Sequence, residues 1–304
     1  MTVLDKLPER ARVAIIRLRS LGDCVLTTPA IALLKEARPD LEIGVVVEDR
    51  FAEVFAGNPA IAQIIEPTWQ ALRRWKPALC VNLHGGTRSQ VMTALSGARW
   101  RAGFAHHSTT LAYNIRIPRA QRILGVHRRV HTAEHLASAF FALGVPIKAV
   151  PRAQLFARET PLSDKHAVLH PFASAPEKQW AAERFTEVAR YQQLWNITPV
   201  FLAGPNDDTA PFAPHAVLKG SLEQVKGVLA NAALFIGNDS GPAHMAAAFG
   251  VPSLVLFSTS DAAIWGPWQT ESEVIVTRDG IDKVSVSRVI AALERLLTFT
   301  EAHA

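Results

Sequence analysis

The sequence has little cysteine and no long apolar stretch. Cys24 and Cys80 are the only cysteines among 304 residues, which argues against a secreted protein held together by disulfides and agrees with a reducing compartment. The N-terminus carries mixed charge and lacks the apolar stretch of a signal peptide. The longest nearly apolar run, 243–257, is interrupted by Gly250 and Pro252, so we expect no transmembrane segment. These features predict a cytoplasmic protein.

Several binding motifs are also missing. The chain shows no zinc-finger spacing, aromatic ribonucleoprotein motif or long basic run, so its net charge of +5 does not by itself indicate a nucleic-acid partner. No Gly-x-Gly-x-x-Gly follows the apolar segments at 12–18 and 167–169, which we expect to be the first strands of two series. An NAD-dependent enzyme is therefore disfavoured.

What the sequence does contain is two series of alternating strands and helices. A chain of 304 residues with 49% hydrophobic residues fits two domains of average size. The expected strands are 12–18, 41–47, 61–65, 77–83 and 100–104 in the first series and 167–169, 199–203, 234–236, 253–257 and 274–277 in the second. Strands that alternate with helices predict an α/β fold with parallel sheets. The linker candidate, Gly144 and Pro146 together with 151–161, divides the chain into domains 1–155 and 156–304.

The stretch 234–257 is the most informative part of the chain. An apolar strand is followed by a tight polar turn, a helix that ends before Pro252, and a second apolar strand. Such a turn places free backbone N–H groups and the positive end of the helix dipole at one point, which suits a phosphate or diphosphate. Asp239 and Ser240 can equally be ordinary N-caps, because both residue types are preferred there.

The sequence of this turn and helix, DSGPxHxAAAxGVP at 239–252, resembles the signature of the lipopolysaccharide heptosyltransferases, glycosyltransferase family 9. These are inverting glycosyltransferases with two facing Rossmann-like domains, the GT-B architecture. The resemblance implies transfer of heptose from ADP-heptose to a lipopolysaccharide inner-core acceptor that carries Kdo or heptose. It assigns donor binding to Asp239, Ser240 and Gly241. His244 either shapes this site or only packs within the helix.

A second motif, SxGDxxxTxP at 20–29, resembles the N-terminal motif of the same family, whose aspartate is the proposed general base. Asp23 would lie on the loop after the first strand, at the carboxyl edge of the sheet, where open α/β folds bind ligands. A carboxylate there can remove the proton of an acceptor hydroxyl. Gly22 would let the loop approach the acceptor closely. The alternative is that Asp23 only caps the following helix.

A third motif begins the second series. The family has a similar loop in which a small hydroxyl residue and a lysine hold the donor phosphates, with a tryptophan after them, and these positions correspond to Ser174, Lys178 and Trp180. An ammonium at Lys178 would stabilise the charge that grows on the leaving nucleotide. Otherwise Lys178 is an exposed loop lysine. Phe172 stands where the family has glycine and Ala181 where it has proline, so the loop departs from the pattern.

Other candidates rest on less evidence. Asp207, in the turn after the strand at 199–203, can bind ribose hydroxyls or merely form the turn. Arg128 and Arg129 belong to a basic run that either receives an anionic, phosphorylated acceptor or is a solvated loop. His84 either faces substrate or is a hydrogen-bonded loop histidine.

The resemblance also bears on cofactors and location. The chain has no Asp-x-Asp pair of the kind that metal-dependent transferases use, so we expect no metal and no cofactor besides the ADP-sugar substrate. The acceptor implies a peripheral position at the inner-membrane surface. By analogy, the last helix, 284–297, packs back on the first domain. One alternative is a related enzyme for another nucleotide sugar. The other is a nucleotide-binding protein whose activity has decayed, which the departures at Phe172 and Ser258 favour and the presence of both Asp23 and Lys178 disfavours.

Overall fold

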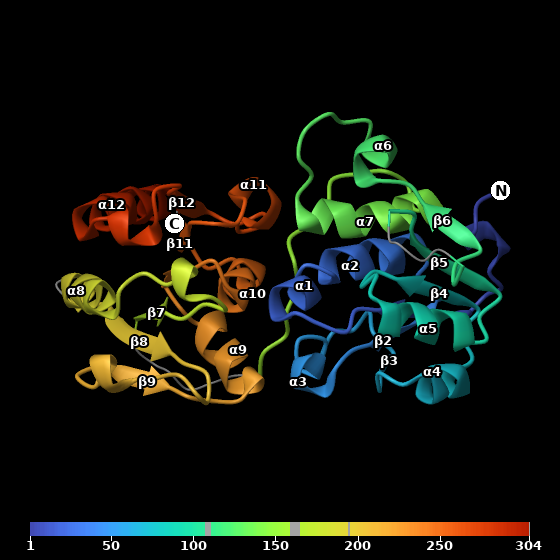
Figure 1. Ribbon diagram of the computed structural model, residues 1–304, viewed down its shortest axis with the longest axis horizontal. Coiled ribbons are helices and arrows are strands. Elements are labelled where there is room, and N and C mark those ends of the chain that lie inside the picture. Colours follow the sequence, from blue (N-terminus) through green and yellow to red (C-terminus); the bar gives the residue numbers. More distant parts are fainter. Residues whose placement is uncertain (107–110, 159–164, 194, 304) are drawn as a thin grey trace. The chain divides into compact units, whose positions relative to one another are not determined.

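The computed structural model describes residues 1–106, 111–158, 165–193 and 195–303. The chain divides into two compact units, Met1–Phe156 and Ala157–Ala304 (Figure 1). Part of the linker candidate at 151–161 lies outside the described residues. Each unit is an α/β domain with its own parallel sheet.

The sheet of the first unit has the strand order β3-β2-β1-β4-β5-β6. Its strands are β1 (Arg12–Ile16), β2 (Glu42–Val46), β3 (Gln63–Ile65), β4 (Leu79–Asn82), β5 (Trp100–Phe104) and β6 (Ile115–Ile117). Its helices are η1 (Leu4–Lys6), α1 (Leu21–Val25), α2 (Thr28–Ala37), α3 (Asp49–Ala52), α4 (Trp69–Trp75), α5 (Thr87–Leu95), α6 (Ala120–Leu124) and α7 (Thr132–Leu143). Helices α2 and α7 cover one face and α4 and α5 the other (Figure 1). Because both faces are covered, β1 is an apolar run buried from Val13 to Ile16.

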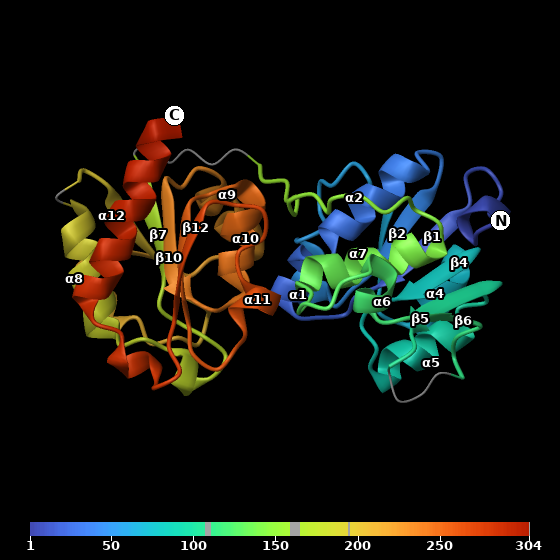
Figure 2. The ribbon, with the colours of Figure 1, turned by 90° about the horizontal axis from the view of Figure 1, so that it is seen from above.

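The second unit has the order β12-β11-β10-β7-β8-β9. Its strands are β7 (His166–His170), β8 (Thr198–Leu202), β9 (Ala216–Leu218), β10 (Leu234–Asn238), β11 (Ser253–Phe257) and β12 (Ser272–Val276). Its helices are η2 (Pro176–Lys178), α8 (Ala182–Gln193), η3 (Ala210–Phe212), α9 (Leu222–Ala230), α10 (Gly241–Phe249), α11 (Ala262–Trp265), η4 (Ile281–Lys283) and α12 (Val286–His303). Helices α8 and α12 lie on one face of the sheet and α9 and α10 on the other (Figure 2).

Both sheets share one topology. If the strands of each unit are numbered from its own beginning, both orders become 3-2-1-4-5-6, the order of dinucleotide-binding folds. In such sheets the chain reverses direction between the first and fourth strands, and ligands bind outside the carboxyl ends of the strands at that point. The topology therefore directs attention to the loops after β1 and β4 in the first unit and after β7 and β10 in the second.

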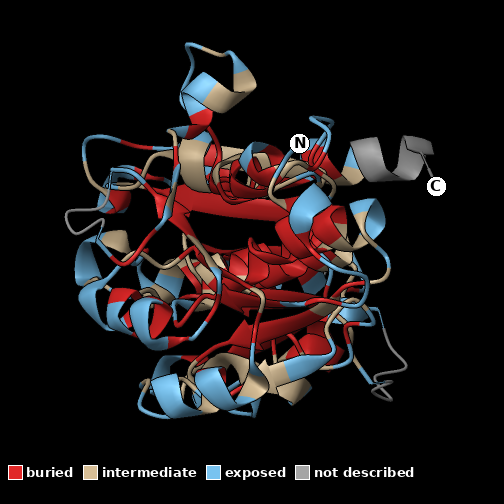
Figure 3. Ribbon diagram, turned by 90° about the vertical axis from the view of Figure 1, so that its right-hand side faces the viewer, coloured by how far each residue is buried: buried red, intermediate tan, exposed pale blue. Residues whose placement is uncertain are grey.

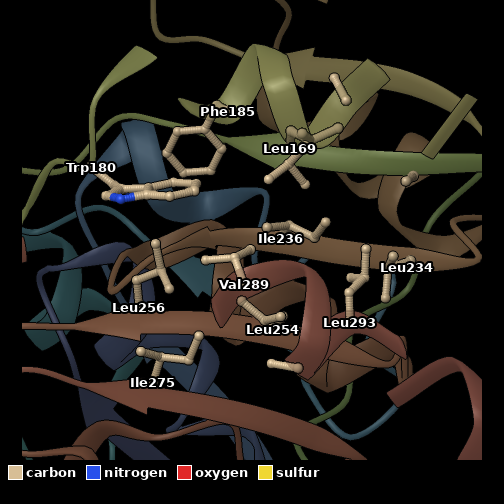
Figure 4. Packing of buried hydrophobic residues seen from close by; sticks show 14 of the residues in the cluster. Leu169, Trp180, Phe185, Leu234, Ile236, Leu254, Leu256, Ile275, Val289 and Leu293 are labelled. Atoms are coloured by element: carbon tan, nitrogen blue, oxygen red, sulfur yellow. The ribbon is translucent and has the colours of Figure 1, made fainter. Parts of the chain in front are cut away.

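The core of the second unit anchors one of these loops. Along the chain, the central strands are buried and the exposed residues lie mainly on helices and loops (Figure 3). In the second unit the core joins the sheet to α8 and α12 (Figure 4). Trp180, at the end of the loop after β7, packs edge-on against Phe185 with ring centroids 5.1 Å apart. Its Nε1 donates to the Val284 carbonyl at 2.8 Å. Removing a buried indole typically costs about 3–5 kcal/mol, so Trp180 fixes the end of this loop firmly.

In the described part of the chain, none of the helices has both the length and the apolarity needed to cross a membrane. The last helix, α12, packs on α8, β11 and β12 of its own unit. Its contact with the first domain stays a prediction.

Candidate active site

An ion pair lies just beyond the carboxyl end of β1. Arg17 Nη1 is 3.2 Å from Asp23 Oδ1. Asp23 Oδ2 accepts hydrogen bonds from the Ser20 hydroxyl at 3.1 Å and the Ser20 backbone N–H at 3.4 Å, so Asp23 does cap the short helix α1. The side chain of Arg17 is 7% exposed and that of Asp23 is 22% exposed. At the carboxyl end of β1, the carboxylate of this pair is therefore more exposed to solvent than the guanidinium.

The adjacent loop after β4 is held by one buried amide. Asn82 ends β4 and is fully buried. Its Oδ1 accepts from the backbone N–H groups of His84 and Gly85, both at 3.0 Å. Its Nδ2 donates to Ser89 Oγ at 3.0 Å and to the Tyr113 hydroxyl at 2.9 Å. With both ends of the amide bonded, the loop has one defined conformation.

His84 leans from this loop toward the loop after β1. Its ring hydrogen-bonds the backbone of Arg19. Burial is the main cause that lowers the pKa of His84, and the nearby Arg17 lowers it further, so the imidazole is neutral near pH 7. A neutral imidazole thus stands beside the loop that carries Asp23.

The second unit carries an ion pair in which the cation, and not the carboxylate, is the more exposed partner. Lys178 Nζ is 2.9 Å from Asp239 Oδ2 and also donates to the hydroxyl of Ser260. Here the lysine side chain is 22% exposed and the aspartate 11%. An ammonium has three N–H donors, so these two bonds leave one for a ligand as far as the described residues show. In this unit the more exposed charge at the carboxyl ends of the strands is therefore a cation.

The Lys178 loop is tied to the neighbouring strands. Asn238, the fully buried last residue of β10, donates from Nδ2 to the Pro171 carbonyl at 2.7 Å and accepts at Oδ1 from the Trp180 N–H at 3.3 Å. The hydroxyl of Ser258 donates to the Glu177 carbonyl at 2.8 Å. These bonds set the position of the ammonium before any ligand binds, as electrostatic stabilisation of a leaving group requires.

The first turn of α10 is open. Ser240 occupies the N-cap position with extended backbone, and its hydroxyl lies 3.0 Å from His170 Nδ1. No side chain in the described residues caps the helix. Burial lowers the pKa of His170 to about 4, so the imidazole is neutral at pH 7. In the first turn Pro242 has no N–H and the Ala243 N–H donates to the Ser240 carbonyl at 3.2 Å, so this helix end offers an anion the Gly241 N–H and the positive end of the helix dipole.

Comparison with known proteins identifies the family. Residues 66–288 match the family model of glycosyltransferase family 9 (heptosyltransferase). The chain belongs to this family. The resemblance read from the motifs is confirmed, and the chain is a glycosyltransferase.

Individual members of the glycosyltransferase 9 family agree along most of the chain. A lipopolysaccharide heptosyltransferase 1 from Pseudomonas aeruginosa is 28% identical over 84% of this chain and 81% of its own length. The structure of E. coli ADP-heptose LPS heptosyltransferase II is 17% identical and covers 95% of this chain and 99% of its own, with a TM-score of 0.81. The E. coli heptosyltransferase WaaC with ADP is 21% identical and covers 94% of this chain and 99% of its own, with a TM-score of 0.78. These structures confirm the predicted fold class, two Rossmann-like domains of the GT-B type.

The structure brings most of the predicted donor residues of this glycosyltransferase to one edge. Lys178 and Asp239 are in contact, and Ser240 and Gly241 begin α10 beside them. Asp207, after β8, accepts from the Gly204 N–H at 2.7 Å and so forms a turn, as the alternative interpretation expected. Its contact with ribose stays a prediction.

Two further donor candidates differ in exposure. Ser174 is exposed in the loop after β7. His244 is buried on α10, and its ring packs edge-on against Trp265 with centroids 6.3 Å apart. Phe172, which replaces the usual glycine, packs against the core and edge-on to Phe212 at 5.9 Å. The bulky ring is therefore turned away from the open part of the loop.

The predicted acceptor residues come from two segments of the first unit. Gly22 is buried next to Asp23 in α1. Arg128 forms a two-pronged ion pair with Glu134, Nη1 to Oε2 at 2.8 Å and Nη2 to Oε1 at 2.6 Å, and is 55% exposed. Arg129 is exposed beside it. The Glu134 pair gives Arg128 a local structural task, and acceptor binding by the two arginines stays a prediction.

Sequence reasoning missed four residues at these edges. Arg17 and Ser260 hold the two charged side chains, Asn238 holds the Lys178 loop, and His170 holds Ser240. One signal was available, because Asn82 and Asn238 each end a buried strand at equivalent points of the two series. Arg17 and Ser260 carry no such signal, since an arginine after a strand and a serine in a loop are common. Among the described residues no group of three or more His, Cys, Asp or Glu side chains is placed to hold a metal ion.

Proposed function

We propose that this glycosyltransferase transfers heptose from ADP-heptose to a lipopolysaccharide inner-core acceptor that carries Kdo or heptose, with inversion at the anomeric carbon. One observation carries the proposal: the ion pair of the first unit exposes its carboxylate, whereas that of the second exposes its ammonium. Glycosyl transfer needs both charges, a base for the nucleophile and a cation for the leaving group. The names of the relatives, lipopolysaccharide heptosyltransferase and ADP-heptose LPS heptosyltransferase, support the choice of donor and acceptor.

On the acceptor side, the Asp23 carboxylate removes the proton of the acceptor hydroxyl as its oxygen attacks the anomeric carbon of the donor. Arg17 and Ser20 fix the orientation of the carboxylate, because each bonds a different oxygen. Arg128 and Arg129 are proposed to attract the phosphates and carboxylates of the acceptor.

On the donor side, the bond between the anomeric carbon and the β-phosphate oxygen breaks, and ADP leaves with the electron pair. Lys178 and the open first turn of α10 stabilise the negative charge that this oxygen gains. Ser174, Ser240 and Gly241 are proposed to bind the diphosphate, and Asp207 the ribose. The new bond forms on the face opposite the leaving group, which gives inversion.

The reaction is proposed to need no metal, because the ammonium and the helix N-terminus supply positive charge at the diphosphate. The partners are the ADP-sugar and a phosphorylated lipopolysaccharide core, which places the protein peripherally at the cytoplasmic face of the inner membrane. Nucleic acid has no part in the proposal.

The nucleotide is tested by thermal unfolding with ADP, UDP, GDP and CMP, each with and without EDTA. A ligand that binds only the folded state raises stability by RT ln(1 + [L]/Kd). We expect a shift with ADP that survives EDTA. A larger shift with UDP or GDP would overturn the donor, and no shift with any nucleotide would favour the decayed protein.

The transfer itself is tested by mass spectrometry of a Kdo-bearing core acceptor incubated with ADP-heptose. We expect a gain of one heptose, and NMR of the product should show the anomeric configuration opposite to that of the donor. Retained configuration would contradict a direct displacement by the acceptor oxygen.

A further inference from the structure

His170 is a half-buried titratable group that the proposed mechanism does not use. It ends β7, the strand at the switch point of the second sheet, and pairs in register with Gly237 of β10. Its Nδ1 lies 3.0 Å from the hydroxyl of Ser240. The contact joins the central strand to the first turn of α10, where the donor diphosphate is proposed to bind.

The imidazole also faces the other half of the donor site. The carboxylate of Asp207, after β8, acts electrostatically on His170 and tends to raise its pKa, although burial outweighs this influence. Strands β8 and β10 flank β7 on its two sides. His170 therefore contacts the serine proposed for the diphosphate and is influenced by the charge of the aspartate proposed for the ribose.

The hydrogen bond to Ser240 diverts that hydroxyl from its usual task. A serine at an N-cap normally accepts from an N–H of the first helical turn. Ser240 does not do so, and its extended backbone, with φ −159° and ψ 169°, leaves the hydroxyl on His170 instead. The diversion costs the helix a cap, and a role in ligand binding explains why the cap is given up.

The tautomer of the imidazole decides what Ser240 can do. If Nδ1 carries the proton, it donates to Ser240 Oγ, and the hydroxyl proton of Ser240 is free to bond a phosphate oxygen. If Nδ1 is bare, the hydroxyl donates to it and offers only lone pairs, which repel phosphate. A bound diphosphate selects the first arrangement, because a chain of donors that ends on an anion strengthens each bond in it.

We propose that His170 is a positioning residue of the donor site, whose Nδ1–H holds the Ser240 hydroxyl so that it donates to the diphosphate of the nucleotide. This inference rests on the proposed function only in placing a nucleoside diphosphate at the start of α10.

A double-mutant cycle on ADP affinity tests the proposal. His170→Ala and Ser240→Ala should each weaken ADP binding about 3- to 10-fold, and the double variant should be no weaker than the weaker single variant, since the two residues act as one unit. His170→Asn should keep the affinity within about 2-fold, because the asparagine amide N–H can take the place of Nδ1–H. Affinities are measured by isothermal titration calorimetry and folding by thermal unfolding.

The matched control is His166 at the other end of β7. It is buried, whereas His170 is half-buried, and its Nε2 lies 2.9 Å from the Val228 carbonyl, so it shares the strand of His170 but not its position at the carboxyl end. His166→Asn should leave the ADP affinity unchanged. An equal loss there would mean that the His170 variants act through the fold and would overturn the proposal.

The remaining outcomes separate this inference from the proposed function. Additive losses in the cycle, or an His170→Asn variant as weak as His170→Ala, would overturn the role of His170 and leave heptosyl transfer standing. If the unaltered protein prefers UDP or GDP, the donor fails and the cycle is run with that nucleotide, because the diphosphate is common to all. If it binds no nucleoside diphosphate, both proposals fail.

Discussion

In the first unit the ion pair at the sheet edge buries its cation, whereas in the second unit it buries its carboxylate. Arg17 is 7% exposed against 22% for Asp23, and Lys178 is 22% exposed against 11% for Asp239. Both pairs follow the central strands of sheets with the same strand order. The same topology thus carries a more exposed carboxylate in one unit and a more exposed ammonium in the other.

The two buried asparagines, Asn82 and Asn238, hold different loops in the two units. Asn82 hydrogen-bonds the backbone of its own loop and the side chains of Ser89 and Tyr113, so in the first unit it holds the loop after β4. Asn238 reaches instead to Pro171 and Trp180, so the rigid element in the second is the loop after β7, which carries Lys178. In the second unit the asparagine therefore holds the loop that carries the exposed charge, whereas in the first unit it holds the loop after β4 and not the segment that carries Asp23.

The largest effect should come from removing the exposed carboxylate of the first unit. Asp23→Asn keeps the shape but cannot accept the acceptor proton, so turnover should fall about 1,000-fold. ADP affinity should stay unchanged, because the donor is proposed to bind the second unit. Transfer is followed by mass spectrometry and ADP binding by calorimetry.

The control is Asp40→Asn, which removes another ion-paired carboxylate of the same unit, bonded to Arg38 at 2.8 Å. Its turnover should match that of the unaltered protein. Full activity in Asp23→Asn would contradict the proposed role of Asp23 as the base, and the difference in exposed charge between the two units would then have no catalytic meaning.

A smaller effect should follow from removing the exposed cation of the second unit. Lys178→Met preserves the side-chain length without the charge, and turnover should fall about 100-fold as the leaving nucleotide loses one donor. Unlike Asp23→Asn, this variant should also weaken ADP binding, about 10-fold. The two variants would then split the site into a proton-removing half and a diphosphate-binding half.

Lys165→Met is the matched control, because Lys165 is an exposed lysine that directly precedes β7. It should change neither quantity. If Lys178→Met lowered turnover with ADP affinity intact, the ammonium would act only on the transition state, and the donor-binding role of Lys178 would be withdrawn.

Much of the fold followed from apolar runs and their flanks. The strands at 100–104 and 253–257 have the bounds that the sequence predicted. For 253–257 the reason is a nearly continuous apolar run between turns, which marks a buried parallel strand well. The residues at 25–37 predict one helix after the first strand, and the structure has α2 at Thr28–Ala37 in this range. A separate short helix, α1, precedes it, because Ser20 and Asp23 cap a turn that begins at Leu21. The elements β6, β9, α4 and α11 were missed because they are short or mixed in composition.

The site divides in the same way. Asp23, Lys178 and Asp239 stand in motifs, and the sequence predicted them as candidates. Their partners come from other parts of the chain: the Ser260 hydroxyl is 82 residues from Lys178, and the Ser240 hydroxyl is 70 residues from His170. Contacts at such separations depend on the register of neighbouring strands, which no local pattern encodes. The sequence likewise did not predict which partner of each ion pair is the more exposed.

The smallest predicted effect concerns acid stability and compares the neutral histidines of the two edges. The pKa of His170 falls from about 6.5 in an unfolded chain to about 4 in the fold, so between these values the unfolded chain binds a proton that the folded protein does not. Stability from this site is complete above about pH 6.5 and is lost as pH falls toward about 4, by about 1.4 kcal/mol per pH unit at most.

The urea midpoint of His170→Asn should therefore fall less steeply between about pH 7 and about pH 5 than that of the unaltered protein. His84→Asn should flatten the curve less, because Asp23 opposes the lowering of its pKa. A curve for His170→Asn parallel to that of the unaltered protein would show that His170 takes up a proton in the fold as readily as in the unfolded chain, and the second edge would lose its neutral histidine.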